Sequence, residues 1–91
     1  MSRKKETYWL ITFANNHRAM EAERFLAEFV KVTVMPTLRE ISSDCGMSLR
    51  IEAEDGPLVQ EKLALLGWPE GSARLYKVTP TSGKPLVEAL D

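Results

Sequence analysis

The chain of 91 residues contains a single cysteine, and this scarcity excludes an internal disulfide. It also contains a single histidine, so no closed zinc site can be built from four cysteine and histidine side chains. We expect neither a metal nor a cofactor. No apolar run reaches the roughly 18–20 residues that a membrane helix needs, and the basic start leads into a strand-like segment without a signal-peptide cleavage pattern. The sequence therefore predicts a cytoplasmic protein with no membrane partner.

An excess of positive charge is also lacking. Lysine and arginine number 12 against 13 acidic residues, which gives a net charge of −1. Domains that bind nucleic acid usually carry a basic face, so we expect no nucleic-acid partner. The chain shows no serine-histidine-aspartate pattern, glycine-rich phosphate loop or paired-carboxylate signature. A stand-alone hydrolase or kinase is therefore not expected.

Hydrophobic residues make up 44% of the chain, enough for the core of one small domain. Strict alternation of apolar and polar residues over 47–54 predicts a half-buried strand. Aromatic and β-branched residues favour further strands, and apolar residues at helical spacing predict two helices. The strands are expected over 8–14, 30–35, 47–54 and 73–79, and the helices over 17–29 and 57–66.

The resulting order, β-α-β-β-α-β, is that of a ferredoxin-like α+β sandwich. Right-handed crossovers place both helices on one face of an antiparallel sheet. The strands over 8–14 and 47–54 are expected in the middle and the other two at the edges, with the opposite face open for a partner. We divide the chain into a basic extension (1–7), the ferredoxin-like domain (8–79) and a linker-like tail (80–91).

Cys45 lies in a polar stretch between two apolar runs, where a thiol meets water. The predicted strand directions bring this stretch to the end of the sheet where the first helix begins. The partial positive charge of a helix start favours an anion such as a thiolate. Arg39 and His17 act in the same direction, whereas Asp44 opposes them. The turn after the second helix reaches this end too, so Trp68 could cover the thiol.

Several neighbours of Cys45 have two interpretations. Ser42, Ser43 and Gly46 could offer hydroxyl and amide groups to an anion, and glycine lets a large partner approach closely. Residue preferences alone favour a simple turn. His17 could carry a proton for Cys45, or it could face water in the first helical turn.

The residues of the first strand (8–13), the helix start (17–23) and above all the stretch 36–50 resemble the Putative selenium/sulfur carrier protein-like family. The most specific part is R-E-I-S-S-D-C-G, followed by an alternating strand with an arginine. The resemblance implies that Cys45 carries selenium or sulfur, that Gly46 is its flexible neighbour, and that the loop residues presenting it are Arg39, Ser42, Ser43 and Asp44. His17 matches the helix-start histidine of the family, and the stretch after Pro80 lies outside the family pattern.

Two classes of function follow. In the first, Cys45 accepts sulfur or selenium as a persulfide-type adduct from a desulfurase-type donor protein and passes it to an acceptor protein. Such a chain is a carrier more than an enzyme with its own substrate pocket. In the second, it is an interaction or regulatory module that binds a partner or a second copy of itself. Cys45 is then incidental or serves as a redox sensor.

Overall fold

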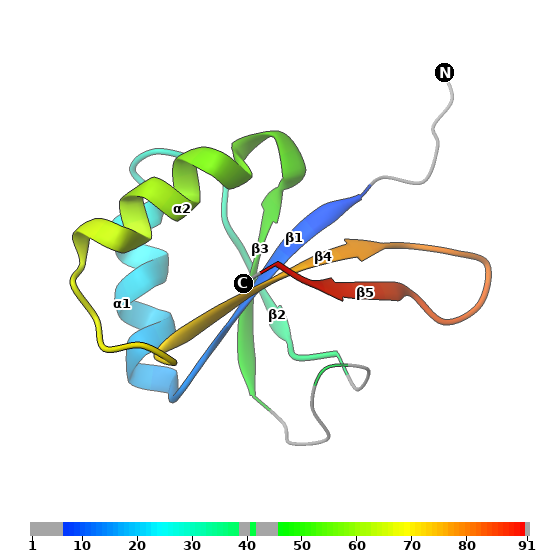
Figure 1. The fold of residues 1–91 in the computed structure, drawn as a ribbon, viewed down its shortest axis with the longest axis horizontal. Coiled ribbons are helices and arrows are strands. Elements are labelled where there is room, and N and C mark those ends of the chain that lie inside the picture. The colour runs from blue at the N-terminus through cyan, green and yellow to red at the C-terminus, as the bar shows by residue number, and fades with distance from the viewer. Residues whose placement is uncertain (1–6, 39–40, 42–45, 91) are drawn as a thin grey trace.

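The computed structural model describes residues 7–38, 41 and 46–90, which form an α+β fold (Figure 1). This confirms the predicted fold class. The elements run in the order β1 (Tyr8–Phe13), α1 (Asn16–Leu26), β2 (Thr33–Pro36), β3 (Met47–Glu52), the short 3₁₀ helix η1 (Ala53–Asp55), α2 (Gly56–Leu65), β4 (Ala73–Thr79) and β5 (Leu86–Ala89).

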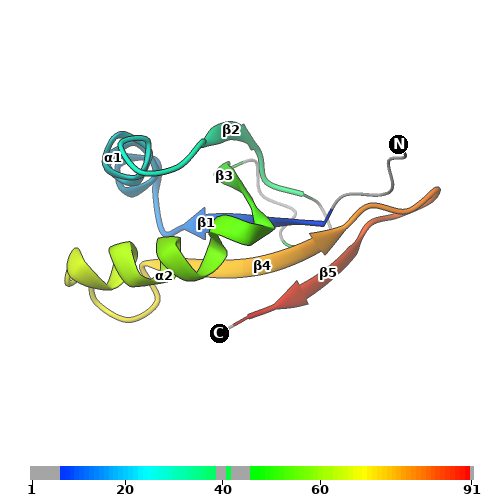
Figure 2. The same cartoon turned by 90° about the horizontal axis from the view of Figure 1, so that it is seen from above.

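The described strands form one antiparallel sheet in the order β2-β3-β1-β4-β5. As predicted, β1 and β3 lie in the middle, and nothing in this order conflicts with the ferredoxin-like arrangement. Figure 2 shows α1 and α2 on the same side of the sheet. The antiparallel directions bring the end of β1, the end of β2 and the start of β3 to one end of the sheet.

The main hydrophobic core lies between the sheet and the two helices. It is built from alternating strand residues and from one stripe of each helix, as the sequence periodicity predicts. Its buried members are Ile11, Ala22, Leu26, Leu49, Ile51, Val59 and Leu75. Phe29, the last residue of the helix predicted over 17–29, lies beyond the end of α1 and is 44% exposed. Its ring packs against Phe25 instead, with centroids 5.5 Å apart.

The face opposite the helices is not the open surface that the sequence predicted. Tyr8, Leu10 and Val78 form a second buried cluster there. Leu38 and Ile41, from the connection between β2 and β3, pack against this cluster. The stretch around Cys45 was predicted to be polar, and these two apolar side chains within it explain the difference.

Strand β2 is shorter than predicted and begins at Thr33, because the chain after α1 still turns and Val30 donates a backbone hydrogen bond to Leu26. The strand includes Pro36 as its last residue. Thr37 donates its N–H to the carbonyl of Gly46, which directly precedes β3. Because backbone hydrogen bonds alternate between the two sides of a strand, the backbone groups of Pro36 point away from β3. Proline lacks an N–H and is tolerated at such an edge position.

The segment expected to be a linker-like tail contributes a strand. Leu86–Ala89 form β5 and pair with β4, so β4 is not an edge strand as predicted. Val87 packs against the second cluster, and Leu90 donates its N–H to Leu75. The sequence signal was weak because this strand is four residues long and follows a stretch rich in proline, serine and glycine.

Candidate functional site

The predicted site depends on two segments lying at the same end of the sheet. Register pairs Pro36 with Met47 and Thr12 with Ser48, so the connection between β2 and β3 starts and finishes beside the end of β1. Helix α1 begins only three residues after β1 ends. The start of α1 and the residues that flank the predicted loop therefore share one end, as the strand directions predicted.

Asn15 caps the first turn of α1. Its backbone is extended, and its side-chain Oδ1 accepts a hydrogen bond of 2.9 Å from the backbone N–H of Arg18. The cap uses one of the unpaired N–H groups of the helix start and leaves others free for solvent or a ligand. No acidic residue lies in this first turn to offset its partial positive charge.

A hollow of about 440 Å³ lies between this helix start and the flanks of the predicted loop. Asn15 and Asn16 line it on the helix side, and Gly46 and Met47 line it on the strand side. Its remaining lining residues are Thr12, Phe13, Ala14, Thr37, Ile41 and Tyr76. None of these described residues is charged, and most of the polar ones can donate a hydrogen bond. Such a lining can accept an anionic group without a competing carboxylate.

The structure describes only some of the residues that were predicted to form the site. Gly46 is exposed and lines the hollow together with the helix start, so this part of the predicted arrangement is present. Other predicted residues lie outside the residues that the structure describes, and these are Arg39, Ser42, Ser43, Asp44 and Cys45. Their predicted roles remain predictions.

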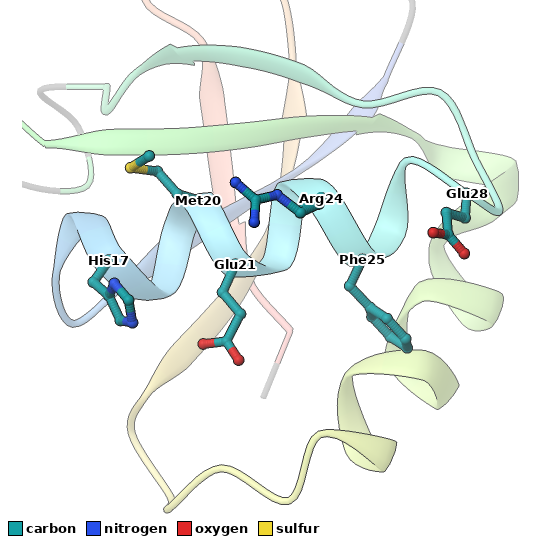
Figure 3. A pocket seen from close by; sticks show the side chains of 6 residues that line it. All are labelled: His17, Met20, Glu21, Arg24, Phe25 and Glu28. Carbon is teal, nitrogen blue, oxygen red and sulfur yellow. The ribbon is translucent and has the colours of Figure 1, made fainter.

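His17 lies in a different hollow, along the outer surface of α1 (Figure 3). This hollow is also lined by Met20, Glu21, Arg24, Phe25 and Glu28. In Figure 3, His17 and Glu21 project to one side of α1 and Met20 to the other. His17 is exposed and does not line the hollow at Gly46. Its proposed role as a proton carrier for Cys45 stays a prediction, because Cys45 lies outside the described residues.

Trp68 lies on the helix side of the sheet. Its ring packs edge-to-face against Phe13, with centroids 6.2 Å apart, and the Arg18 guanidinium lies over it. Trp68 does not line the hollow at Gly46, although Phe13 does. The turn after α2 therefore reaches the predicted end of the sheet, where it supports the start of α1.

Two residues that were not predicted to belong to the site lie at the base of the predicted loop. The side-chain oxygens of Thr37 and Ser48 are 2.6 Å apart and share a hydrogen bond. Ser48 is fully buried, although the alternation over 47–54 predicted a solvent-facing side chain. A serine on the polar side of that strand gave no signal of burial, and the partner that the structure gives it, Thr37, lies 11 residues away in the sequence.

Among residues 7–38, 41 and 46–90, no group of three or more histidine, cysteine, aspartate and glutamate side chains is placed to hold a metal ion. None of the helices in the same part of the chain has the length and apolar composition that spanning a membrane requires.

A protein-family model matches the elements that build this end of the sheet. The family is described as "Putative Se/S carrier protein-like", and its model matches residues 8–66. The chain belongs to this family. The matched range runs from β1 to the first residue beyond α2 and includes both the start of α1 and Cys45. Neither the comparison with curated proteins nor that with solved structures gave a match.

Proposed function

We propose that this Se/S carrier-like protein carries a terminal sulfur or selenium atom on Cys45 between a donor protein and an acceptor protein. The observation that carries the proposal is the shared hollow of Gly46 and the α1 start. Cys45, which carries the thiol, directly precedes Gly46 in the sequence, and Gly46 lines the hollow. Family membership supports the same chemistry, because the family description names a carrier of selenium or sulfur.

The proposed transfer needs no oxidant. The Cys45 thiolate attacks the terminal sulfur of a donor persulfide, and a bond forms between its Sγ and that sulfur. The sulfur–sulfur bond of the donor breaks, and its electron pair leaves with the donor cysteine as a thiolate. The proton stays on the terminal sulfur as that sulfur moves to Cys45, so Cys45 ends as a persulfide and the donor as a thiolate. Attack by an acceptor thiolate on the same terminal sulfur then regenerates the Cys45 thiolate.

Both thiolate and persulfide anion benefit from the same surroundings. The start of α1 carries no acidic residue in its first turn, and the described lining of the hollow is uncharged. A partial positive charge beside uncharged hydrogen-bond donors favours an anion over its neutral form. This arrangement suits a carrier, which has to hold a reactive sulfur without cleaving a substrate. We place the relay in the cytoplasm, where desulfurase-type donors would supply the sulfur.

Intact-protein mass spectrometry tests the proposal. The chain is incubated with a cysteine desulfurase and cysteine, separated from the donor and measured without reductant. We expect the wild type to gain the mass of one sulfur atom, and Cys45→Ala to gain none. An unmodified wild type, or an equal gain in Cys45→Ala, contradicts the carrier function. A mixed disulfide with the donor in place of the added sulfur indicates the redox-sensor alternative.

Strand β5 is an edge strand of the sheet that the described residues form, and this favours a second candidate, self-association through β5. The N–H of Leu90 donates a hydrogen bond to the carbonyl of Leu75. Since successive residues of a strand direct their backbone groups to opposite sides, those of Val87 and Ala89 point away from β4. Leu86 is 64% exposed on the same strand. An edge strand with unpaired backbone groups can pair with that of a second copy.

Light scattering after size exclusion tests this candidate with two proline variants. Ala89→Pro removes an outward N–H without removing a bond to β4. A dimer in the wild type that becomes a monomer in Ala89→Pro supports pairing through β5. A monomeric wild type at all concentrations contradicts it. Glu88→Pro is the comparison, because it does remove a hydrogen bond to β4. We expect it to lower the stability of the protein by weakening the pairing of β5 with β4.

A further inference from the structure

We propose that the outer edge of β2, together with the side of α1 next to it, binds an extended acidic segment of a partner protein. This surface consists of described residues only, and its role does not depend on the carrier function. In the sheet that the described residues form, β2 is one of the two edge strands. In Figure 2, α1 lies on the β2 side of the helix layer and α2 on the β4 side.

The backbone of β2 offers hydrogen-bonding groups along this edge. Thr37 donates its N–H to the carbonyl of Gly46, and successive residues of a strand direct their backbone groups to opposite sides. The N–H and C=O of Val34 and the C=O of Pro36 therefore point away from β3. No strand of the described residues pairs with this side of β2. An extended segment supplies partners for these groups when it adds to the sheet as a further strand.

Side chains next to this edge give the added strand an apolar contact surface. Val34 lies opposite Leu49 of the main core, so its side chain is on the helix face of the sheet, and it is 42% exposed. Met20 is 51% exposed, and Figure 3 shows it directed from α1 to the side where β2 lies. A hollow of about 220 Å³ follows one face of α1 and is lined by Met20, Glu23, Arg24 and Ala27. Apolar side chains on alternate residues of the added strand fit against this surface.

Charge decides which kind of segment fits. Arg24 and Lys31 are both exposed, one on α1 beside this edge and the other just before β2. Glu23, the carboxylate of the hollow, is half-buried. An acidic segment therefore meets two exposed cations of opposite charge. A second copy that added its own β2 would bring the same cations to both sides of one seam, and its Pro36 would lack an N–H for the pairing.

The probe is a capped synthetic peptide of alternating glutamate and valine, whose valines face Val34 and Met20. A peptide residue directly opposite Val34 directs its N–H and C=O to β2. Exchange of backbone amide hydrogens, followed residue by residue in NMR spectra, measures binding at the edge itself. We expect the peptide to slow exchange of the Val34 N–H and to leave unchanged that of Ala89, which points outward from β5. N-methylation of the peptide's valines should abolish the effect, and N-methylation of its glutamates should not.

Two pairs of variants separate the backbone contribution from the charge contribution. Val34→Pro removes an outward N–H and should weaken peptide affinity roughly two- to tenfold. Ala89→Pro makes the same change at the other edge and should leave the affinity unchanged. Arg24→Glu should weaken binding of the glutamate peptide and strengthen that of a peptide with lysine in place of glutamate. Arg74→Glu, the same change at an exposed position of β4, is its control.

Several results would overturn the proposal. One is that the glutamate peptide does not slow exchange of the Val34 N–H, and another is that the lysine peptide slows it equally. Equal affinity in Val34→Pro and Ala89→Pro has the same meaning. If Val34→Pro does not fold, equal affinity in Arg24→Glu and Arg74→Glu takes its place. Slower Val34 exchange at rising protein concentration without peptide would show that a second copy occupies this edge, and the acidic segment would then be wrong.

Discussion

The Arg18 guanidinium carbon lies 4.8 Å from the centroid of the Trp68 ring. This contact ties the first turn of α1 to the turn after α2, and the edge-to-face packing of Phe13 against the same ring ties both to the end of β1. The start of α1 is therefore held from the helix side of the sheet. Its opposite flank is free to line the hollow that it shares with Gly46.

Trp68→Leu should destabilise the domain by about 2 kcal/mol, because a half-buried ring and its cation–π contact are both lost. Arg18→Gln, which removes only the cation, should cost about 0.5 kcal/mol. Urea unfolding followed by circular dichroism measures both. Equal losses in the two variants would mean that the ring contributes nothing beyond its contact with Arg18.

Gly56→Ala should also destabilise the domain, by about 2 kcal/mol. A Cβ at Gly56 would lie 2.5 Å from a ring carbon of Trp9, so the indole has to move. Helix propensity alone predicts the opposite sign, since alanine inside a helix is favoured over glycine by about 1 kcal/mol. Gly83→Ala, with open space around its Cβ, is the control with little expected change. A stabilised Gly56→Ala in urea unfolding would show that Trp9 does not pack there.

Much of the fold could be predicted because each element carries its own period. The alternation over 47–54 and the helical spacing over 17–29 both depend on neighbours in sequence, and the structure buries Leu49 and Ile51 of the strand and one stripe of the helix. Ser48 is the exception on the strand. Gly67 and Pro69 marked the end of α2, and Gly67 adopts a φ of 65°, which favours glycine. Strand β4 has the predicted bounds.

The sequence could not reveal features that depend on contacts between distant segments. Leu38 and Ile41 are two apolar residues in a polar stretch, and only the folded sheet shows that they cover Tyr8 and Leu10. The hydrogen bond between Thr37 and Ser48 has the same origin. Strand directions did place Gly46 beside the helix start, but they could not fix the direction of the His17 side chain, which depends on its rotation about α1.

Asn15 links the stability of α1 to the proposed chemistry. Asn15→Ala should cost about 1 kcal/mol in urea unfolding, because the hydrogen bond to Arg18 is lost. Asn15→Asp keeps a capping oxygen and should change stability by less than about 0.5 kcal/mol. Its negative charge, in the hollow lined by Gly46, should nevertheless slow alkylation of Cys45 by disfavouring a nearby thiolate. An unchanged alkylation rate in Asn15→Asp would place the thiol away from this hollow.

The reactivity of Cys45 should come from the fold and not from its sequence neighbours alone. A synthetic peptide of residues 39–50 keeps Arg39 and Asp44 but lacks α1. We expect the iodoacetamide rate of the folded protein to reach half its maximum at a lower pH than that of the peptide, because only the protein supplies the helix start. Coincident pH profiles would assign any activation to the local charges.

The carrier function is tested most directly by counting labile sulfur on the isolated protein. After loading by a desulfurase and removal of the donor, cyanide converts terminal sulfur to thiocyanate, which is measured against protein concentration. We predict about one labile sulfur per chain in the wild type and none in Cys45→Ser. The count should fall to none when the loaded protein is treated with an acceptor thiol and separated from it before the cyanide is added. A wild type without labile sulfur, or a Cys45→Ser variant with as much as the wild type, would contradict the account.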